Sequence, residues 1–380
     1  MKKKKLLMIT WRDIKSPFAG GAETFTHQIL KRLKKKFDIT VLTSAFPHCR
    51  LKETIDGINY LRLGSKRFNY IGVYNWRIYF SVFRYYLTTI RKSQHFDVVI
   101  EQINNIPFLY ALYGERNAFI QIHQLCRQNW FYQVPKLLAW IGYLFFEPLY
   151  LWLLRNKKVI TISQSTKKEL VRYGFKKSNI YIAPVGNILE PLKTLKGIKK
   201  FARFTILSLG NIRNMKRTHH QVIAFELAKQ KVPSLQMFIS GSPAGSYAAM
   251  VFDMIHKSPY KKDIHYLGHL SDKQKREYLQ KSHCILTTST KEGWGLTVTE
   301  ANSQGAVAIG YSADGLRDSI KHNKTGILCY QHTPECLAKN IVKLYKDKKL
   351  YQQLQKNAWE WSKSFTFENS AKAYLDIIDN

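Results

Sequence analysis

The sequence has few acidic residues: 26 Asp and Glu stand against 60 Lys and Arg, which gives a formal net charge of +34 at pH 7. This excess predicts a polyanionic partner, and nucleic acid, an anionic membrane and phosphorylated substrates all fit that description. Cysteine is also scarce, with five residues in 380 and no Cys-x-x-Cys pair. The odd number argues against a disulfide framework and the spacing against a zinc site. Cysteines that are few and odd in number favour reduced thiols, and so a reducing, cytoplasmic compartment.

Several nucleotide and metal motifs are absent as well. The sequence contains no GxxxxGK[ST] loop, and no GxGxxG follows the first predicted strand. These absences argue against P-loop proteins and dinucleotide oxidoreductases. No Asp-x-Asp pair is available to hold a divalent ion on a diphosphate. We therefore expect a site that uses no metal and no other cofactor.

Long uninterrupted apolar runs are lacking too. The stretch 6–10 is about five residues long and no small-residue cleavage site follows it, so it predicts a buried strand rather than a signal peptide. The better membrane candidate is 134–154, VPKLLAWIGYLFFEPLYLWLL, which Lys136, Glu147 and Pro148 interrupt. Its apolar pieces are shorter than the roughly 20 residues of a membrane span. We expect a kinked amphipathic helix that is buried or lies in a membrane interface.

Short β-branched or aliphatic runs alternate with helix-like segments along the whole chain, which is typical of parallel sheets covered by helices. Helices are predicted at 22–35 and 166–173, the second with a loose capping box that begins at Ser165. Strands are predicted in two series: 6–10, 39–43, 98–101, 119–123, 159–163 and 180–183, then 204–209, 236–240, 264–267, 284–288, 307–310 and 326–329.

Proline, glycine and lysine interrupt this pattern after residue 184. We therefore predict a first domain at 1–187, a linker at 188–202 and a second domain at 203–355. The remainder, 356–380, is predicted to be helical and able to cross back to the first domain. Two doubly wound domains that face each other would place the ligand site in their cleft, at the carboxyl ends of the strands.

The segment 292–300, EGWGLTVTE, has the most specific pattern for a ligand site. It follows a predicted strand and continues into a helical stretch. Gly293 and Gly295 allow the backbone to approach a ligand, and a helix start presents free N–H groups to phosphate oxygens. Glu300 lies about one turn into the helix, where we expect it to face the same pocket as Glu292. For Glu300 alone, a carboxylate that merely complements the helix dipole is an equally good interpretation.

The residues from 292 to 329, EGWGLTVTEANSQGAVAIGYSADGLRDSIKHNKTGILC, resemble the nucleotide-sugar site of family 4 retaining glycosyltransferases. Three other segments resemble the same family in the same order: AGGAETF (19–25), ITISQSTKKELVRYGFKKSNIYIAPVGN (160–187) and LGNIRNMKR (209–217). The resemblance implies the GT-B fold, which is α/β with two Rossmann-like doubly wound parallel-sheet domains facing across a cleft. It also implies a retaining, metal-independent hexosyltransferase that uses a UDP- or GDP-sugar and front-side substitution.

The resemblance further implies roles for single residues. Glu292 matches the acid that contacts the transferred sugar, and Glu300 matches the acid that binds the nucleotide ribose. Gly20 and Gly21 match two glycines of a loop that lies near the donor phosphates and the acceptor. Gly295, Leu296 and Thr297 match three positions whose backbone amides face the sugar and diphosphate.

A lysine is expected to neutralise the diphosphate, and Lys216 matches it. The family's usual arginine directly after the glycine is Asn211 here. Arg213 either supplies that charge or is a solvated loop residue. The base would be read by 241–247, GSPAGSY.

His123, at the end of predicted strand 119–123, is together with Glu292 a predicted catalytic residue. The resemblance places it beside the sugar hydroxyls or the acceptor, although a lone histidine is more often structural. Glu101 and Asn104 are weaker candidates for acceptor contact, with Gln102 and Asn105 beside them.

The basic residues suggest where the acceptor lies. Residues 31–36, 66–67 and 155–158, with the aromatic segment 140–152, predict a docking face for anionic lipid headgroups, solvated helix faces being the alternative. A glycan or lipid-linked acceptor at the cytoplasmic membrane face would follow, in the synthesis of lipopolysaccharide, capsule or another surface glycan.

Two other classes of protein remain open on the sequence. One is a GT-B-fold nucleotide-sugar epimerase, or less readily a phosphorylase. The other is a basic protein without transferase activity that binds nucleic acid or membrane. Nucleic-acid binding would account for the charge but would leave the glutamate pair and the two-domain series unexplained.

Overall fold

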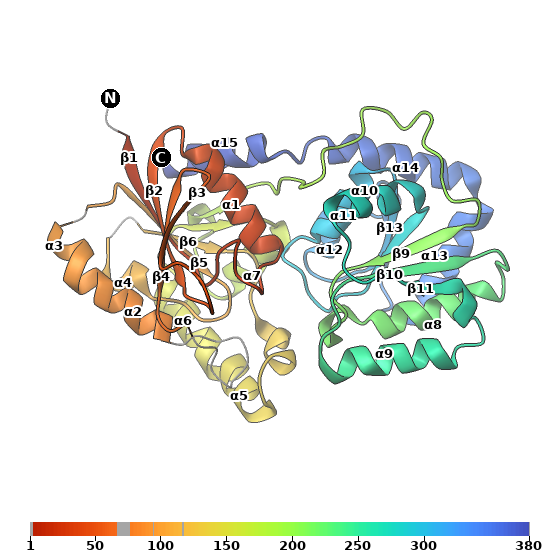
Figure 1. The fold of residues 1–380 in the computed structure, drawn as a ribbon, viewed down its shortest axis with the longest axis horizontal. Coiled ribbons are helices and arrows are strands. Elements are labelled where there is room, and N and C mark those ends of the chain that lie inside the picture. Colours follow the sequence, from red (N-terminus) through yellow and green to blue (C-terminus); the bar gives the residue numbers. More distant parts are fainter. Residues whose placement is uncertain (1–2, 67–76, 94, 116–117, 380) are drawn as a thin grey trace. The chain divides into compact units, whose positions relative to one another are not determined.

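The computed structural model describes residues 3–66, 77–93, 95–115 and 118–379. The chain forms two compact units, Met1–Gly186 with Phe367–Asn380, and Asn187–Thr366. Each unit is a mainly parallel sheet with helices packed on it (Figure 1). This confirms the predicted α/β class with two Rossmann-like domains.

The first unit has an eight-stranded sheet in the order β3-β4-β2-β1-β5-β6-β7-β8. Apart from the edge strand β3, the strands are parallel, and Leu6 of β1 lies between Ile39 of β2 and Val98 of β5. Leu6 to Ile9 are buried, as their apolar run predicts. The strands are β1 Lys4–Ile9, β2 Phe37–Ser44, β3 Lys52–Ile55, β4 Ile58–Leu63, β5 Val98–Ile103, β6 Phe119–Ile122, β7 Val159–Thr161 and β8 Ile180–Ile182.

Strands β3 and β4 are absent from the sequence prediction. They form an antiparallel hairpin whose two turn residues, Asp56 and Gly57, both have positive φ, 53° and 78°. An Asp-Gly pair is a strong signal for this kind of two-residue turn. The sequence thus carried a turn signal for this hairpin, followed by the mostly apolar strand β4, INYLRL, that the prediction did not use.

Helices of the first unit surround this sheet. Helix α7 is capped by Ser163, whose Oγ accepts the backbone N–H of Thr166, so the predicted cap at Ser165 was wrong. Ser163 takes that place because its backbone is extended, as is usual for an N-cap residue, and its hydroxyl reaches the free N–H. The helical segments are α1 Gly21–Leu33, α2 Arg77–Tyr85, π-helix η1 Tyr86–Ile90, α3 Arg91–Ser93, α4 Tyr110–Tyr113, 3-10 helix η2 Arg127–Tyr132, α5 Lys136–Ile141, π-helix η3 Gly142–Phe146, α6 Glu147–Leu154, α7 Gln164–Arg172, 3-10 helix η4 Lys177–Asn179 and α15 Phe367–Ile378.

The second unit has a six-stranded parallel sheet in the order β11-β10-β9-β12-β13-β14. From β9 the chain adds β10 and β11 on one side of the sheet and then β12, β13 and β14 on the other side. The boundary between β9 and β12 is therefore the topological switch point, where open α/β sheets bind ligands. The strands are β9 Thr205–Leu209, β10 Gln236–Ser240, β11 Ile264–Tyr266, β12 Cys284–Thr287, β13 Val307–Tyr311 and β14 Gly326–Cys329.

Helices cover both faces of this second sheet, and two separate apolar clusters fill the space beneath them. The segment 188–202, predicted to be a linker, is folded onto this unit: Leu189 is buried, and Lys200 Nζ donates to the carbonyls of Ser282 and Gly305. The helical segments are η5 Asn214–Lys216, α8 Thr218–Lys229, α9 Gly245–Lys257, η6 Lys261–Asp263, α10 Asp272–Lys281, α11 Leu296–Ser303, α12 Leu316–Ser319, α13 Pro334–Lys346 and α14 Lys348–Ser362.

Candidate functional site

A small polar pocket opens at the carboxyl ends of β9 and β12, at the switch point of the second sheet. Two of the predicted donor-site residues, Lys216 and Thr297, line it. Most of its other side chains carry hydroxyl groups, which can donate hydrogen bonds to an anion. The lining residues are Ser208, Leu209, Gly210, Lys216, Thr218, Gln221, Leu286, Thr287, Thr288, Ser289 and Thr297.

Glu292 and Lys216, which are 76 positions apart in the sequence, form an ion pair beside this pocket. Ser289 Oγ donates a second hydrogen bond to Glu292 Oε1 at 2.6 Å. Burial acts to raise the pKa of Glu292, but the cations of Lys216 and Arg213 and the Ser289 bond outweigh it, and the pKa is lowered. Glu292 is therefore an ionised acceptor at neutral pH.

Two glycines hold the loop that carries Glu292. Gly315 has φ +78°, and a Cβ there would overlap the backbone carbonyl of Glu292. The Glu292 N–H donates to the carbonyl of Asp314 at 3.0 Å. Gly295 has φ +91°, and a Cβ there would lie 2.9 Å from side-chain atoms of Leu316 and Ser319. The loop therefore packs directly on the turn before α12.

Helix α11 begins at this same loop, with Gly295 as its N-cap. The N–H groups of the first turn of a helix have no partner within the helix and carry partial positive charge. Leu296 and Thr297 stand in that first turn, and Thr297 lines the pocket. Their place in the first turn means that their backbone amides are available to a ligand, as the sequence predicted. Their role toward a sugar or diphosphate stays a prediction.

Glu300 lies further along α11 and is 3% exposed. Lys275 of α10 donates to its Oε1 at 3.0 Å, a partner that the sequence did not predict. Burial raises the pKa of Glu300, and the Lys275 cation opposes that shift. The structure shows a direct cationic partner for each of the two predicted acids, Lys216 for Glu292 and Lys275 for Glu300.

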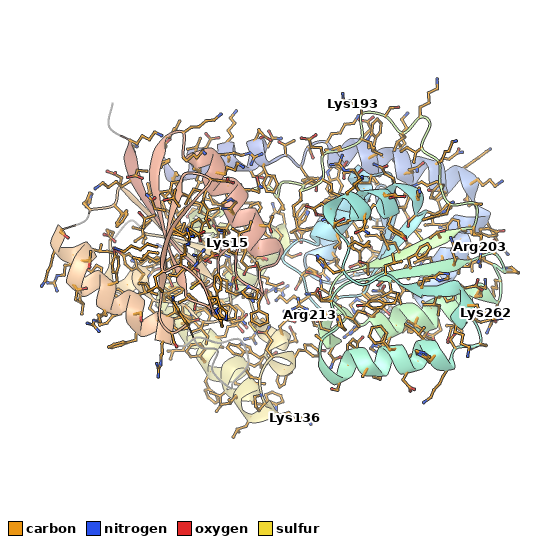
Figure 2. The ribbon with its side chains drawn as sticks, viewed as in Figure 1. Lys15, Lys136, Lys193, Arg203, Arg213 and Lys262 are labelled. Atoms are coloured by element: carbon orange, nitrogen blue, oxygen red, sulfur yellow. The ribbon has the colours of Figure 1, made fainter. Side chains whose placement is uncertain are left out.

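Arg213 lies in the loop that follows β9 and projects from the second unit (Figure 2). Its side chain is exposed, and Asn211, where the family usually has arginine, is exposed as well. The positive charge of Arg213 contributes to the lowered pKa of Glu292. Whether Arg213 supplies the missing arginine charge to a ligand or is a solvated loop residue, the two roles that the sequence allowed, stays a prediction.

In the first unit, Gly20 is the N-cap of α1 and Gly21 begins the helix. The Gly20 N–H donates to Glu23 Oε2 at 2.7 Å, and Arg12 lies 3.2 Å from the other Glu23 oxygen. Arg12 was not among the predicted site residues. Its only sequence signal is its position just after the first strand, where ligand sites of parallel sheets lie.

His123 follows β6 and lies in a polar cluster of the first unit. Its Nε2 is 2.9 Å from the side-chain nitrogen of Gln121, and its ring meets Phe25 edge-on. Burial lowers the pKa of His123 to about 4. The imidazole is therefore neutral at pH 7 and can either donate or accept a hydrogen bond.

The other predicted acceptor residues have internal partners. Glu101 is fully buried, and its two oxygens accept the N–H groups of Leu109 and Ala111 at the start of α4, at 2.9 and 3.1 Å. Burial raises its pKa to about 7. The structure thus gives Glu101 the role of a helix cap. Asn104 Oδ1 accepts a 3.3 Å bond from Gln102, which is buried.

Within the described ranges, no group of three or more His, Cys, Asp or Glu side chains could hold a metal ion. The positive groups of the candidate site are instead Lys216, Arg213 and the amides at the start of α11. Cations and free helix amides of this kind suit an anionic ligand.

Two protein families match this chain. Residues 19–187 match the family described as Glycosyltransferase Family 4, and residues 196–361 match Glycosyl transferases group 1. The fold and these matches define the class: the chain belongs to the family 4 glycosyltransferases, which have the GT-B fold.

Curated relatives share lower identity over part of the chain. Poly(glycerol-phosphate) alpha-glucosyltransferase of Bacillus subtilis (strain 168) is 26% identical over 47% of this chain and 26% of its own length. N-acetyl-alpha-D-glucosaminyl L-malate synthase of Bacillus anthracis is 25% identical over 45% of this chain and 44% of its own. The chain therefore spans less than half the length of these two relatives.

Solved structures match over nearly the whole chain and share its fold. Sucrose-phosphate synthase from Thermosynechococcus elongatus has a TM-score of 0.79 at 16% identity, with 99% of this chain and 98% of that chain covered. Anabaena HepE in complex with UDP and glucose has a TM-score of 0.73 at 15% identity, with 99% of each chain covered. WaaG, a glycosyltransferase of lipopolysaccharide biosynthesis, has a TM-score of 0.74 at 14% identity, with 98% of this chain and 99% of that chain covered.

Proposed function

We propose that this protein is a retaining glycosyltransferase that moves a hexosyl unit from a UDP- or GDP-sugar to an acceptor hydroxyl of a surface glycan or glycolipid. The observation that carries this proposal is the Glu292–Lys216 ion pair beside the hydroxyl-lined pocket of the second sheet. Membership of the glycosyltransferase family supports it. HepE, which shares the fold, binds UDP and glucose, and this supports a nucleotide-sugar donor.

The charges of the site suit a diphosphate. Lys216 forms an ion pair with Glu292 in the structure. A donor diphosphate would share Lys216 with Glu292 and would also attract Arg213 and the first-turn amides of α11. Glu292, which stays ionised, would then accept hydrogen bonds from sugar hydroxyls.

Retention of configuration would follow from front-side substitution. The bond from the anomeric carbon to the diphosphate oxygen breaks while the bond to the acceptor oxygen forms on the same face. The acceptor proton passes to the departing phosphate oxygen, so no residue of the protein becomes covalently attached. Lys216, Arg213 and the amides would stabilise the charge on the leaving diphosphate, a task that we propose needs no metal.

The alternatives from the sequence are less well supported. Both matched families are glycosyltransferases, and together they extend over both units. Neither an epimerase nor a nucleic-acid-binding protein gains support from these matches. Product analysis would still separate them, because an epimerase would return an isomerised donor or a free sugar without glycosylating an acceptor.

Calorimetry with UDP, GDP and ADP and their common sugar conjugates, in the presence of EDTA, tests the proposal. We expect one base to bind selectively, and Lys216→Ala to weaken that binding by at least tenfold. Lys193→Ala is the matched control, because Lys193 is an exposed lysine of the same unit (Figure 2). Failure of every nucleotide to bind, or unchanged affinity in Lys216→Ala, would overturn the assignment of the donor site.

A further inference from the structure

Large apolar side chains are exposed along one helical run of the first unit, Lys136–Leu154, made of α5, η3 and α6. The exposed fractions are 74% for Leu137, 67% for Phe145, 56% for Leu149 and 51% for Trp140. Among the described residues, this is the one helix that is long and apolar enough to cross a membrane. A contiguous exposed apolar surface of this kind marks an interaction site.

A second helical run adds to this surface. Phe80 of α2 is 67% exposed, and Phe83 and Leu87 of α2 and η1 are 40% and 38% exposed. The inward residues of both runs belong to the same apolar cluster, Ile78 from α2 and Leu151 from α6 among them. Figure 1 shows α2, α5 and α6 along the same lower side of the first unit. We call the exposed apolar residues of 77–90 and 136–154 the apolar face.

The charges around the apolar face are almost all positive. Residues 77–96 contain four Lys and Arg and no acidic residue, and residues 118–168 contain seven Lys and Arg and one acidic residue, Glu147. Glu147 is fully buried, so it does not add negative charge to the surface. Lys136 projects outward where α5 begins (Figure 2), and Arg155 stacks over Trp152 at 4.4 Å. An apolar surface bordered by cations is complementary to anionic lipid.

Two of the basic segments that the sequence predicted for docking, 31–36 and 66–67, add little to the charge at the apolar face. In 31–36, the side chains of Lys31, Arg32 and Lys36 form ion pairs with acidic residues of the same unit. In the pair 66–67, Arg67 lies outside the described residues. The predicted segments 140–152 and 155–158 both remain at the apolar face.

The contacts of Glu147 argue against a membrane-spanning orientation of the 136–154 run. Its carboxylate accepts the N–H groups of Cys126 and Arg127 at 2.7 and 2.8 Å and the Trp130 indole N–H at 2.9 Å. A Cβ on Gly142 would lie 2.7 Å from the Trp130 ring, so the helix also packs closely on η2. Spanning would break these contacts and place an unpaired carboxylate in hydrocarbon, which is costly.

We propose that the apolar face docks the first unit on a bilayer rich in anionic lipids. The exposed Leu, Phe and Trp side chains enter the boundary between headgroups and acyl chains, while the surrounding Lys and Arg side chains contact the headgroups. One consequence of docking rests on the proposed function, namely that the acceptor is a lipid-linked molecule held at that membrane. Docking itself can be measured without any catalytic activity.

Flotation of the full chain with vesicles tests the docking. We expect binding to phosphatidylglycerol–phosphatidylcholine vesicles, and at least tenfold weaker binding of the triple variant Trp140→Ser, Phe145→Ser, Leu149→Ser. Tyr330→Ser is the matched control, because Tyr330 is 68% exposed in the second unit. Nucleotide binding should be unchanged in the triple variant, and this separates failure of docking from failure of the donor site.

Three results would overturn the docking proposal. The first is equal vesicle binding by the wild type and the triple variant. The second is equal binding to vesicles of phosphatidylcholine alone, which would contradict the role of the basic residues. The third is a wild-type dimer that the triple substitution dissociates while vesicle binding is absent in both forms, which would make the apolar face an interface between protein copies.

A second, independent observation concerns the polar cluster around His123. The Tyr374 hydroxyl, on the C-terminal helix α15, donates to Gln121 Oε1 at 2.8 Å. In this arrangement the amide nitrogen of Gln121 donates to Gln102 Oε1 at 3.4 Å and lies 2.9 Å from His123 Nε2. An amide nitrogen can only donate, so Nε2 must accept, and the ring proton must be on Nδ1. Among the described residues, the structure shows no hydrogen-bond partner for Nδ1.

We infer that Gln121 and Tyr374 are positioning residues that hold His123 in the Nδ1–H tautomer. Nδ1–H is then the donor that His123 offers to a bound substrate. This deepens the proposed function, because it specifies which atom of a predicted catalytic residue faces the reaction. The C-terminal helix, far away in the sequence, thereby takes part in the site of the first unit.

Nitrogen-15 NMR of histidine-labelled protein tests this inference without an activity assay. The His123 signals are assigned by their loss in His123→Asn. We expect the Nδ1–H tautomer in the wild type and a mixture with Nε2–H in Tyr374→Phe, with unchanged nucleotide affinity and lower turnover. Predominant Nε2–H in the folded wild type would overturn the inference, whatever the outcome for the donor site.

Discussion

At the scale of single residues, the candidate donor site is defined by which cation neutralises which carboxylate. Glu292 and Glu300 were identified from their spacing in one motif, and the sequence also indicated Lys216. Their pairing could not be predicted, because Lys216 and Lys275 reach the two acids from other elements. The two pKa shifts differ in direction for this reason: the Lys216 ion pair, the Ser289 hydroxyl and the charge of Arg213 lower the pKa of Glu292, whereas burial dominates at Glu300.

Glu292→Gln should lower turnover at least tenfold with nucleotide affinity kept within about threefold. The substitution removes the ionised acceptor proposed for the sugar but leaves Lys216 for the diphosphate. Steady-state kinetics and calorimetry measure the two effects. Glu277→Gln is the control, because Glu277 is an exposed carboxylate of the same unit. A loss of nucleotide binding equal to the loss of turnover would contradict the separate roles.

Glu300→Ala should weaken nucleotide binding more than tenfold, about 1.4 kcal/mol or more, because charge-assisted bonds to the ribose are lost. The change also leaves the Lys275 cation without its buried partner. Glu300→Gln keeps the size of the side chain and checks that loss of binding does not come from unfolding. Unchanged affinity in both folded variants would remove Glu300 from the donor site.

At the scale of elements, tight turns decide where the site loops lie. The strands predicted from apolar runs are present. Strands of a parallel sheet are buried on both faces, so each one is recognisable from the apolar residues of its own short segment. The β3–β4 hairpin was missed because β3, KETI, is short and mostly polar, and because Asn59 and Arg62 interrupt the apolar residues of β4, INYLRL. Gly315 matters for a reason no local pattern shows, since its neighbour in space is the backbone of Glu292.

Gly315→Ala should destabilise the protein by more than about 2 kcal/mol, because a positive φ costs roughly 1–2 kcal/mol for a residue with Cβ and the overlap with Glu292 adds to it. Gly197→Ala is the matched control: its φ is +85°, but a Cβ there meets nothing within 4 Å. Urea unfolding of the two variants separates strain from overlap. Equal destabilisation would show that the contact with Glu292 contributes nothing.

At the scale of the whole molecule, partly buried histidines link stability to pH. Burial lowers the pKa of His123, His220 and His283 to about 4. The unfolded chain binds these protons near pH 6.5 and the folded chain only near pH 4, so the unfolded state holds more protons in between. Stability should therefore fall as the pH is lowered through this range.

We expect the melting temperature to fall by at least about 4 °C between pH 6.5 and pH 4.5, since 1 kcal/mol corresponds to about 2–4 °C for domains of this size. In His283→Gln the fall should be smaller, because one of the three proton-binding groups is gone. Differential scanning calorimetry at several pH values measures both. A fall of the same size in the variant would show that His283 does not titrate as its burial implies.

The sequence by itself determined the two α/β series, the class of fold and the motifs of the candidate donor site. These depend on the period of apolar residues and on residues a few positions apart, which a chain carries locally. Only the tertiary structure decided that Glu101 caps α4, that Lys275 pairs with Glu300 and that Tyr374 reaches Gln121. It also decided that the apolar residues of 136–154 are exposed. Each depends on which distant segments pack together, and burial and hydrogen-bond partners exist only once that packing has formed.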